Sequence, residues 1–299
     1  MVRLSVVTLS YNTSSITFDC VTSIIKSLES TSSALTYEVI VIDNKSSDSS
    51  VENLKKFQAH FVSEKGIFTF IENKKNVGYP AGNNQGWHMA RGEYILFLNS
   101  DVMIDKVDFS SLLEYLDTNK EVGVLTVRVN LSRGGIDPAS HRGFPTLWNS
   151  FCYFLKLEKI LRSIPLINRV FGGYHQTYKN INEVHEIDSP TGAFYLTRYR
   201  ILKEMGGFDE EYFMYGEDLD LSYRIKEKGY KVMYYPLFSV THLKYSSGLG
   251  KQDEVARKKT KEHFFEAMKI FYKKHYQAHY PKVINAIVYW LIDLKKNLS

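Results

Sequence analysis

The stretch Tyr94-Ile95-Leu96-Phe97-Leu98-Asn99-Ser100-Asp101 joins five hydrophobic residues directly to an amide, a hydroxyl and a carboxylate. A short apolar run without polar alternation is typical of a strand that is buried on both faces of a parallel sheet. Ligands of such sheets bind beyond the carboxyl ends of the strands. The stretch therefore predicts a central strand that ends at a ligand site.

Further apolar runs lie on both sides of this stretch and alternate with segments of helical spacing. The predicted strands are residues 4–9, 38–42, 67–71 and 122–127, and the predicted helices are residues 15–29, 49–58, 82–90 and 110–116. This alternation indicates βαβ units and an α/β fold with a largely parallel sheet. Tyr11, Asp43, Asn76 and Asp101 follow strands, so we expect their side chains to converge at one edge of the sheet.

The second half of the chain is less regular. Residues 134–186 interrupt the alternation with aromatic, aliphatic and basic residues, and we interpret them as helices inserted at about residues 140–180. The elements predicted beyond them are strands at 187–197 and 231–235, a charged helix at 216–228, and helices after Asp253 with a break at Pro281.

The composition is that of a globular protein that can build a sizeable core, with 44% hydrophobic and 24% charged residues over 299 positions. Cys20 and Cys152 form no CxxC pair, which argues against a thiolate zinc site and fits a reducing compartment. The first residues lack the layout of a signal peptide, and no run of about 18 apolar residues predicts a spanning helix. We therefore expect a cytoplasmic location.

The positive charge is concentrated near the end of the chain. The net charge is +5, yet residues 251–299 hold 11 of the 38 Lys and Arg residues and only 5 of the 33 Asp and Glu residues. A basic segment points to an anionic partner, either nucleic acid or a lipid headgroup layer. Residues 273–298 combine apolar residues at helical spacing with flanking lysines, which suits an amphipathic helix at a membrane interface. A helix packed on the protein's own core or in a homodimer has the same periodicity, so both alternatives remain.

Two loops in the first half have the chemistry of a nucleotide site. Asp43 ends the strand at residues 38–42, where a carboxylate can accept hydrogen bonds from a nucleobase, although Asp also caps helices and builds turns. The stretch Asn76-Val77-Gly78-Tyr79-Pro80-Ala81-Gly82-Asn83-Asn84 opens a helix with small residues, and a helix N-terminus favours phosphate. Many glycine loops only make turns, so this pattern alone is weak.

Two further motifs carry the residue types of a catalytic centre. Asn99 and Asp101 supply the oxygen ligands that Mg²⁺ or Mn²⁺ prefers, although an isolated Asn-x-Asp is more often a turn. His242 can add a ligand if Asp101 binds a metal; a lone His is otherwise structural or solvated. Glu217 and Asp218 begin a helix, where acids often serve only as partners of the helix dipole. The alternative function for one of them is a general base held near a sugar hydroxyl.

The order and spacing of these motifs resemble family-2 glycosyltransferases with the GT-A fold. The stretches that carry the resemblance are Val6–Asn12, Val41–Asn44, Asn76–Gly78, Ala81–Asn84, Leu98–Asp101, Thr191–Phe194, Gly207–Glu210 and Gly216–Leu221. They cover most of the chain, and they look closest to the bacterial rhamnosyltransferase-like branch that builds cell-surface polysaccharides, including those of the cell wall.

The resemblance implies a single Rossmann-like nucleotide-binding domain with a helical insertion and C-terminal helices. Residues 1–250 would be the GT-A catalytic domain, divided into a nucleotide-sugar half (1–130) and an acceptor half (131–250). Residues 251–299 would be basic amphipathic helices. The implied activity is inverting transfer of rhamnose from dTDP-rhamnose to a glycan or polyprenyl-linked glycan, with a UDP-hexose or UDP-N-acetylhexosamine as alternative donor.

The resemblance also implies a role for each matched position. Nucleotide-sugar contacts are expected from Thr8, Tyr11, Asp43, Asn76, Gly78, Asn83, Asn99, Ser100, Thr191, Gly192 and Ala193. Asp101 would bind Mn²⁺ or Mg²⁺ with His242 as a further ligand, and Asp218 would be the catalytic base with Glu217 beside it. The family's usual metal motif is Asp-x-Asp, and Asn99 replaces its first acid here. One strong anionic ligand then remains, so we expect weak metal binding without the nucleotide diphosphate.

Three other classes of protein compete with this hypothesis. A nucleotidyltransferase that makes the activated sugar usually has a glycine-rich N-terminal signature, whereas residues 6–12 contain no glycine. A nucleotide-sugar-binding protein without transfer activity would not need both Asp101 and Asp218. A nucleic-acid binder would use the basic C-terminal segment but leaves the acidic motifs unexplained.

Overall fold

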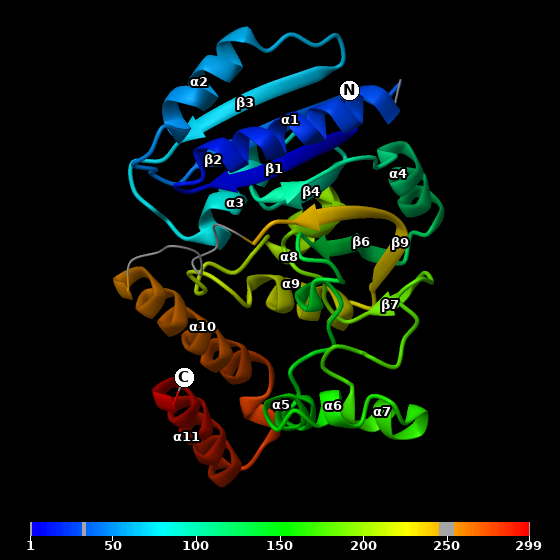
Figure 1. The fold of residues 1–299 in the computed structure, drawn as a ribbon, viewed down its shortest axis with the longest axis vertical. Coiled ribbons are helices and arrows are strands. Elements are labelled where there is room, and N and C mark those ends of the chain that lie inside the picture. The colour runs from blue at the N-terminus through cyan, green and yellow to red at the C-terminus, as the bar shows by residue number, and fades with distance from the viewer. Residues whose placement is uncertain (1, 32–33, 245–253, 299) are drawn as a thin grey trace.

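The computed structural model describes residues 2–31, 34–244 and 254–298, and its centre is a sheet of nine strands (Figure 1). The strands are β1 (Leu4–Ser10), β2 (Tyr37–Asp43), β3 (Gly66–Glu72), β4 (Tyr94–Leu98), β5 (Val102–Met103), β6 (Val122–Leu131), β7 (His185–Ile187), β8 (Phe194–Arg198) and β9 (Lys231–His242). Their order is β3-β2-β1-β4-β8-β6-β9-β5, and β7 pairs with β9. Six strands run in one direction and β5, β7 and β8 run against them, which confirms the expected mixed, mostly parallel sheet.

Helices cover both faces of this sheet. The covering helices are α1 (Ser14–Thr31), α2 (Ser50–His60), α3 (Tyr79–Met89), α4 (Phe109–Thr118), α8 (Tyr199–Met205) and α9 (Glu217–Glu227). Alternate residues of β2 enter different cores: Val39 packs with residues of α1 and α4, whereas Ile40 packs with Trp87 of α3 and with residues of α8 and α9. Because both faces of the strand are buried, an unbroken apolar run is required there.

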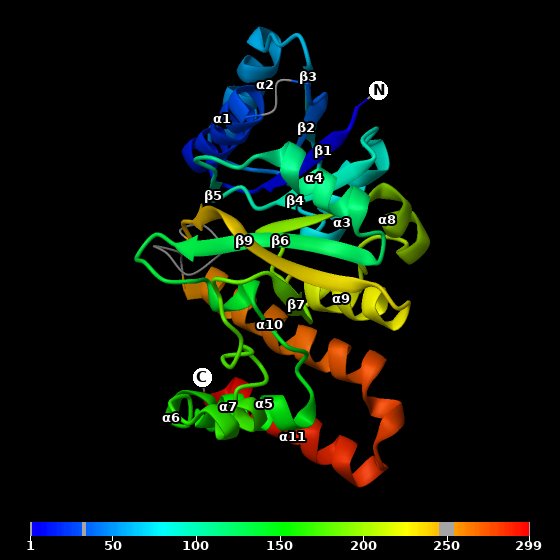
Figure 2. The same cartoon turned by 90° about the vertical axis from the view of Figure 1, so that its right-hand side faces the viewer.

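The remaining helices lie away from the sheet. They are α5 (Leu147–Phe154), α6 (Leu157–Ile160), α7 (Pro165–Phe171), α10 (Glu254–His275) and α11 (Lys282–Leu298), and α11 lies beside α5, α6 and α7 at the end opposite α2 (Figures 1 and 2). Ala267 and Phe271 of α10 pack on Tyr212 and Leu219. Among the described residues, no helix is both long enough and apolar enough to cross a membrane.

A buried hydrogen bond also holds α10 against the helices that cover the sheet. Nε2 of His275 lies 2.8 Å from Oδ1 of Asp220, whose carboxylate is fully buried at the start of α9. Nε of Arg224 contacts the other oxygen of Asp220 at 2.7 Å. A buried carboxylate needs such partners, so the first turn of α9 and the last turn of α10 depend on each other.

The structure differs from the sequence-based expectation in the third quarter of the chain. Residues 187–197 are not one strand: β7 ends at Ile187, β8 begins at Phe194, and the intervening turn includes Gly192. The helix α8, which directly follows β8, was not expected. It has only seven residues, too few to show a clear helical periodicity in the sequence. The strand predicted at residues 231–235 continues to His242 through an irregularity in its pairing with β6.

Two adjacent glycines provide a test of the packing behind α3. Gly206 and Gly207 both have φ of +77°, but only a Cβ on Gly207 would meet other atoms, lying 2.5 Å from Nε1 of Trp87. We expect Gly206→Ala to lower the free energy of unfolding by about 1–2 kcal/mol through backbone strain alone. Gly207→Ala should cost about 1 kcal/mol more, because the indole must also move. Urea unfolding of both variants measures the difference, and equal losses would contradict the close approach.

Candidate active site

Asn44, which directly follows β2, organises the loops at the carboxyl edge of the sheet. Its Nδ2 donates to Oδ1 of Asn76 at 2.9 Å and to the carbonyl of Gly78 at 3.1 Å. Its Oδ1 accepts a hydrogen bond from the backbone N–H of Val77 at 3.1 Å. One side chain thus holds the segment that leads into α3, and Gly78, at φ of +89°, makes the turn.

The residues predicted to contact the nucleoside lie at the ends of β1 and β2. Tyr11 is about half exposed, whereas Thr8 and Asp43 are fully buried, and Oγ1 of Thr8 has no hydrogen-bond partner among the described residues. Both oxygens of Asp43 accept hydrogen bonds from Ser46, one from its N–H and one from its hydroxyl. These contacts are those of a residue that forms a turn. Each carboxylate oxygen of Asp43 can still accept one more hydrogen bond, for example from a ligand.

A chain of hydrogen bonds connects the predicted donor-site residues of three separate segments. The hydroxyl of Tyr79 donates to Oδ1 of Asn99 at 2.7 Å and lies 3.4 Å from the carbonyl of Gly192. Burial, with the nearby Glu217, Asp218 and Asp101, raises the pKa of Tyr79 well above its ordinary value, so this hydroxyl remains a donor. A Cβ at position 192 would lie 2.6 Å from this hydroxyl, which explains why glycine stands there.

The other predicted contacts surround this chain. Asn83 is buried, and its Nδ2 donates to the carbonyl of Tyr79 at 3.0 Å, within the same helix. Ser100 lies in the turn after β4. The hydroxyl oxygen of Thr191 accepts a hydrogen bond from the N–H of Ala193 at 3.4 Å, so these residues shape the turn around Gly192.

Asp101 and His242, predicted to bind a metal, lie together where β5 pairs with the end of β9. Nε2 of His242 is 3.1 Å from Oδ1 of Asp101, and Nδ1 is 2.8 Å from Oδ2 of Asp137. Burial opposes protonation of this imidazole, but the two carboxylates outweigh it and raise the pKa of His242 to about 9. Burial likewise opposes ionisation of Asp137, yet His242 and Lys244 lower its pKa to about 2.

The donor set of this corner fits a divalent cation that has further ligands from elsewhere. Oδ2 of Asp101 is buried and makes no hydrogen bond to described residues. Nε2 of His242 faces the other oxygen of Asp101 at 3.1 Å, so it would have to give up its proton to bind a cation. Nδ1 of His242 faces a carboxylate, which is how histidine ligands are commonly oriented toward metals. Within residues 2–31, 34–244 and 254–298, no group of three or more His, Cys, Asp or Glu residues is arranged to hold a metal. A cation at this corner would therefore have two candidate protein ligands, Asp101 and His242, and would need further ligands from elsewhere.

Asp218 is held at the start of α9 by three donors. Its Oδ2 accepts hydrogen bonds from Nη2 of Arg142 at 2.8 Å and from the N–H of Gly192 at 3.1 Å. Its Oδ1 accepts from the N–H of Leu219 at 2.7 Å. The ion pair with Arg142 is almost entirely buried, so both side chains have one fixed position. The carboxylate is thereby linked through Gly192 to Tyr79 and Asn99.

Glu217, the neighbour of Asp218, has the opposite environment. It is buried, and its Oε2 has no hydrogen-bond partner among the described residues. Burial, reinforced by the charge of Asp218, raises the pKa of Glu217 well above its ordinary value of 4.5. The site therefore holds a paired carboxylate next to an acid that retains its proton, two groups with different chemistry at adjacent positions.

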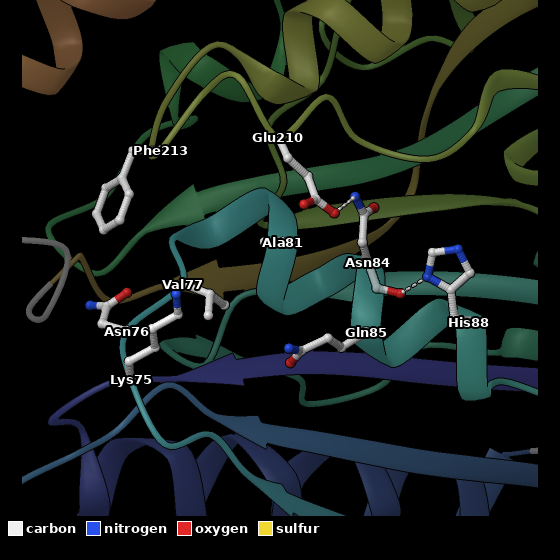
Figure 3. Close-up of a pocket in the computed structure, with 9 residues that line it drawn as sticks. All are labelled: Lys75, Asn76, Val77, Ala81, Asn84, Gln85, His88, Glu210 and Phe213. Carbon is white, nitrogen blue, oxygen red and sulfur yellow. Dashed lines mark hydrogen bonds between the residues drawn. The ribbon is translucent and has the colours of Figure 1, made fainter.

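A cavity of about 540 Å³ adjoins this region on the outer side of α3 (Figure 3). Its lining residues are Lys75, Asn76, Val77, Ala81, Asn84, Gln85, His88, Glu210 and Phe213. Asn84 donates to Glu210 across it at 2.9 Å. Only Asn76 is shared with the predicted site, and neither Glu217 nor Asp218 lines the cavity, so this cavity does not contain the predicted base.

Sequence reasoning missed three residues of the site. Arg142 and Asp137 lie in the irregular segment after β6, where no strand or helix pattern singles out a position. Asn44 appeared only as the companion of Asp43. A polar residue that is buried in an irregular loop has no periodic signal, so pairing with a distant acid becomes visible only in the fold.

The sheet order, the covering helices and the strand-end site define the GT-A class of glycosyltransferases. The chain belongs to glycosyl transferase family 2, whose sequence pattern matches residues 5–180. It is a glycosyltransferase.

Known proteins with similar sequences act on different sugars. The chain is 28% identical to the rhamnosyltransferase WbbL of Escherichia coli (strain K12) over 211 residues, which cover 69% of this chain and 72% of that protein. It is 32% identical to the poly(ribitol-phosphate) beta-glucosyltransferase of Bacillus spizizenii, but over only 40% of this chain and 17% of that protein. Similarity at this level supports the shared activity, and the sugar differs among these relatives.

Solved structures agree with the fold. The chain resembles Staphylococcus aureus TarS 1–349 in complex with UDP, with a TM-score of 0.53 and 18% identity over 91% of this chain and 72% of that one. It also resembles GalNAc-T7 with UDP, GalNAc and Mn²⁺, with a TM-score of 0.64 and 17% identity over 91% of this chain and 48% of that one.

The raised pKa of Glu217 predicts a pH-dependent stability. As the pH rises above 4.5, the unfolded chain loses this proton while the folded protein keeps it, so the free energy of unfolding falls. Glu217→Gln removes the effect. We expect the variant to gain more than about 1 kcal/mol relative to the wild type between about pH 5 and pH 8, because one pKa unit is worth about 1.4 kcal/mol. Urea unfolding at both pH values measures this gain.

Glu211→Gln is the matched control, because the side chain of Glu211 is about half exposed. Its stability should follow the wild type across the same pH range. Parallel curves for wild type and Glu217→Gln would contradict the buried, protonated state of Glu217.

Proposed function

We propose that this enzyme transfers a sugar from a nucleotide-activated donor to a hydroxyl of a glycan acceptor, with inversion at the anomeric carbon. The observation that carries the proposal is the fixed carboxylate of Asp218, connected through Gly192 and Tyr79 to Asn99 at the end of β4. This connection links a candidate base to the strand end at which ligands of α/β sheets bind. Transfer in a single displacement requires a base near the donor site.

The chemistry assigned to Asp218 is proton acceptance. The acceptor hydroxyl attacks the anomeric carbon, its proton passes to a carboxylate oxygen of Asp218, and the bond to the nucleotide diphosphate breaks with the electron pair leaving on the diphosphate. One displacement of this kind inverts the configuration. Glu217 lies beside the base on the acceptor side.

Arg142 acts in this scheme as a positioning residue. It contacts Asp218 and the carbonyl of Pro190, so it fixes the carboxylate relative to the turn at Gly192. A guanidinium group is planar and presents its donors in fixed directions, so it orients a carboxylate as well as neutralising its charge. Orientation of a catalytic group to within a fraction of an ångström contributes strongly to rate, which gives Arg142 an effect without contact with the substrate.

The proposed donor is dTDP-rhamnose, on the strength of the similarity to WbbL. The alternatives are UDP-hexoses and UDP-N-acetylhexosamines. They are supported by the beta-glucosyltransferase and by poly-beta-1,6-N-acetyl-D-glucosamine synthase, to which the chain is 23% identical over 67% of its length. Thr8, Tyr11 and Asp43 are proposed to contact the nucleoside. The remaining proposed contacts to the donor are Asn76, Gly78, Asn83, Asn99, Ser100, Thr191, Gly192 and Ala193.

Asp101 and His242 are proposed to hold Mn²⁺ or Mg²⁺. The support is the buried, unpartnered Oδ2 of Asp101, the adjacent Nε2 of His242, which a cation would bind in place of a proton, and the carboxylate of Asp137 behind the imidazole. When bound, the cation would neutralise charge on the diphosphate leaving group. Because Asn99 replaces the usual first acid of the motif, the protein's own ligands are few, and the nucleotide diphosphate is expected to strengthen binding.

The proposed cellular role is synthesis of a cell-surface polysaccharide on the cytoplasmic side of the membrane. The acceptor is a glycan, in the proposal a polyprenyl-linked one, and residues 273–298 contact the membrane surface peripherally. Residues 1–250 are the proposed catalytic domain, with halves at 1–130 and 131–250, and residues 251–299 form the appended helices. Nucleic acid has no part in the proposal; a homodimer through the C-terminal helices is the alternative use of that face.

Asp218→Asn tests the proposed base. The variant keeps the shape of the side chain but cannot take up the proton, so transfer should fall at least about 100-fold while donor binding persists. Binding of dTDP-rhamnose, UDP-glucose and UDP-N-acetylglucosamine to this variant by calorimetry also identifies the donor. Glu211→Gln should transfer normally, and normal turnover by Asp218→Asn would remove Asp218 from this role. Failure of all three donors to bind would favour a different nucleotide sugar.

Chelation tests the proposed metal. EDTA should abolish transfer, and Mn²⁺ or Mg²⁺ should restore it. The Asp101→Asn variant should bind Mn²⁺ at least about tenfold more weakly than the wild type when nucleoside diphosphate is present. The electron paramagnetic resonance signal of Mn²⁺ measures this binding. Full activity in EDTA, together with unchanged Mn²⁺ binding by the variant, would contradict the assignment.

A further inference from the structure

The C-terminal helix α11 presents its apolar side outward. Its inward side is largely polar: Oδ1 of Asn285 accepts from the hydroxyl of Tyr272, and the hydroxyl of Tyr289 donates to Gln277, both at 2.6 Å. Ile292 is the one buried residue of the helix. The exposed apolar side consists of Val283, Ile284, Ile287, Trp290, Leu291, Leu294 and Leu298. A helix packed on its own core has the reverse arrangement, so the described part of the chain does not cover this side.

The inserted helices α5, α6 and α7 are also apolar on their exposed surface. Leu166 is 81% exposed, and Ile160, Val170 and Phe151 are each more than half exposed. A hydrogen bond joins the first and last of these helices, because Nε1 of Trp148 on α5 donates to the carbonyl of Val170 on α7 at 2.8 Å. The insertion is therefore an internally hydrogen-bonded group of helices with large hydrophobic side chains exposed on its surface.

The two apolar surfaces belong to one end of the molecule. Both views place α11 next to α5, α6 and α7, away from the sheet (Figures 1 and 2). Nζ of Lys295 on α11 lies 6.0 Å from the ring centre of Phe154 on α5, which joins the two parts directly. A cluster of large exposed apolar side chains at one end of a folded protein marks an interaction site.

The charges around this surface select the partner. The insertion carries Lys156, Lys159, Arg162 and Arg169 as exposed cations, and its only acid, Glu158, is buried against His175. Arg162 and Arg169 line a cavity of about 350 Å³ beside Tyr178, and neither forms an ion pair with another described residue. On α11, Lys282 is exposed, and the acid Asp293 is paired with Lys269. Two copies that met through this face would bring like charges together, whereas anionic headgroups would complement them.

We infer that α5, α6, α7 and α11 form one docking surface for a bilayer that contains anionic lipids, with the insertion as an equal contributor. Leucine, isoleucine and tryptophan side chains enter the interface, and the arginine and lysine side chains meet the lipid phosphates. The inference rests on the membrane contact proposed above for residues 273–298 and extends it to the insertion, but it does not depend on the proposed transfer reaction.

Vesicle binding by the whole protein tests this surface. Wild-type protein should float with phosphatidylcholine vesicles that contain about one third phosphatidylglycerol, and bind at least about tenfold more weakly to phosphatidylcholine alone. Leu166→Glu on the insertion and Trp290→Glu on α11 should each weaken binding about tenfold or more. Val62→Glu is the matched control, because Val62 is 92% exposed at the other end of the molecule, and its binding should equal the wild type.

The outcomes separate the occupants. Loss of binding in both variants, with melting temperatures unchanged, supports the composite surface. Wild-type binding by Leu166→Glu would overturn the contribution of the insertion. No binding by wild-type protein, or a dimer in solution that both variants convert to monomer, would overturn the membrane as partner. Because the readout is flotation, loss of transfer in Asp218→Asn leaves this result unaffected.

Discussion

The buried ion pair between Arg142 and Asp218 connects the parts of the site that sequence places far apart. Asp218 begins α9, Arg142 lies in the irregular segment after β6, and Gly192 lies in the turn before β8. Removal of a carboxylate from water requires a partner of opposite charge and further donors, and Asp218 has all of these. The guanidinium also binds the carbonyl of Pro190, so displacement of Arg142 or Asp218 would leave a buried charge unpaired, and displacement of the turn would remove a hydrogen bond from each of them. The contacts of Asp218 with three separate segments therefore restrict the position of its carboxylate more than contacts within one loop could.

The sheet supplies the second half of the arrangement. The strands β1, β2 and β4 are parallel neighbours, so their carboxyl ends deliver Tyr11, Asp43 and Asn99 to one edge. The antiparallel β8 pairs with β4 and brings the turn at Gly192 to the same edge, where Tyr79 bridges it to Asn99. A wholly parallel sheet would end both strands there, and the turn that receives Asp218 would lie at the opposite edge. The reversal at β8 is therefore what brings Asn99 and Asp218 to the same edge of the sheet.

Sequence alone predicted most of the first half of the fold, since strands buried on both faces must read as unbroken apolar runs. The run Tyr94–Leu98 agrees with β4 at both ends. Prediction failed where two short elements share one apolar stretch, as at residues 187–197, because periodicity cannot detect a tight turn at Gly192. For the site, the resemblance implied that Asp101 and His242 share one metal shell, and the two side chains do lie together. It could not reveal Arg142 or Asp137, whose roles arise from partners 76 and 105 positions away.

Hydrogen bonds and ion pairs connect the insertion to the candidate active site. Only a few residues separate Arg142 from the start of α5, and the N–H of Phe144 between them donates to Asp188 at 3.1 Å. That carboxylate also contacts Lys226 of α9, the helix that begins with Glu217 and Asp218. Movement of the insertion would therefore be transmitted to Asp218, the proposed base, along two short paths, through Arg142 and through Asp188. Anchoring of the insertion at a surface would restrict both paths together, which favours a fixed geometry of Asp218 toward an acceptor presented at that surface.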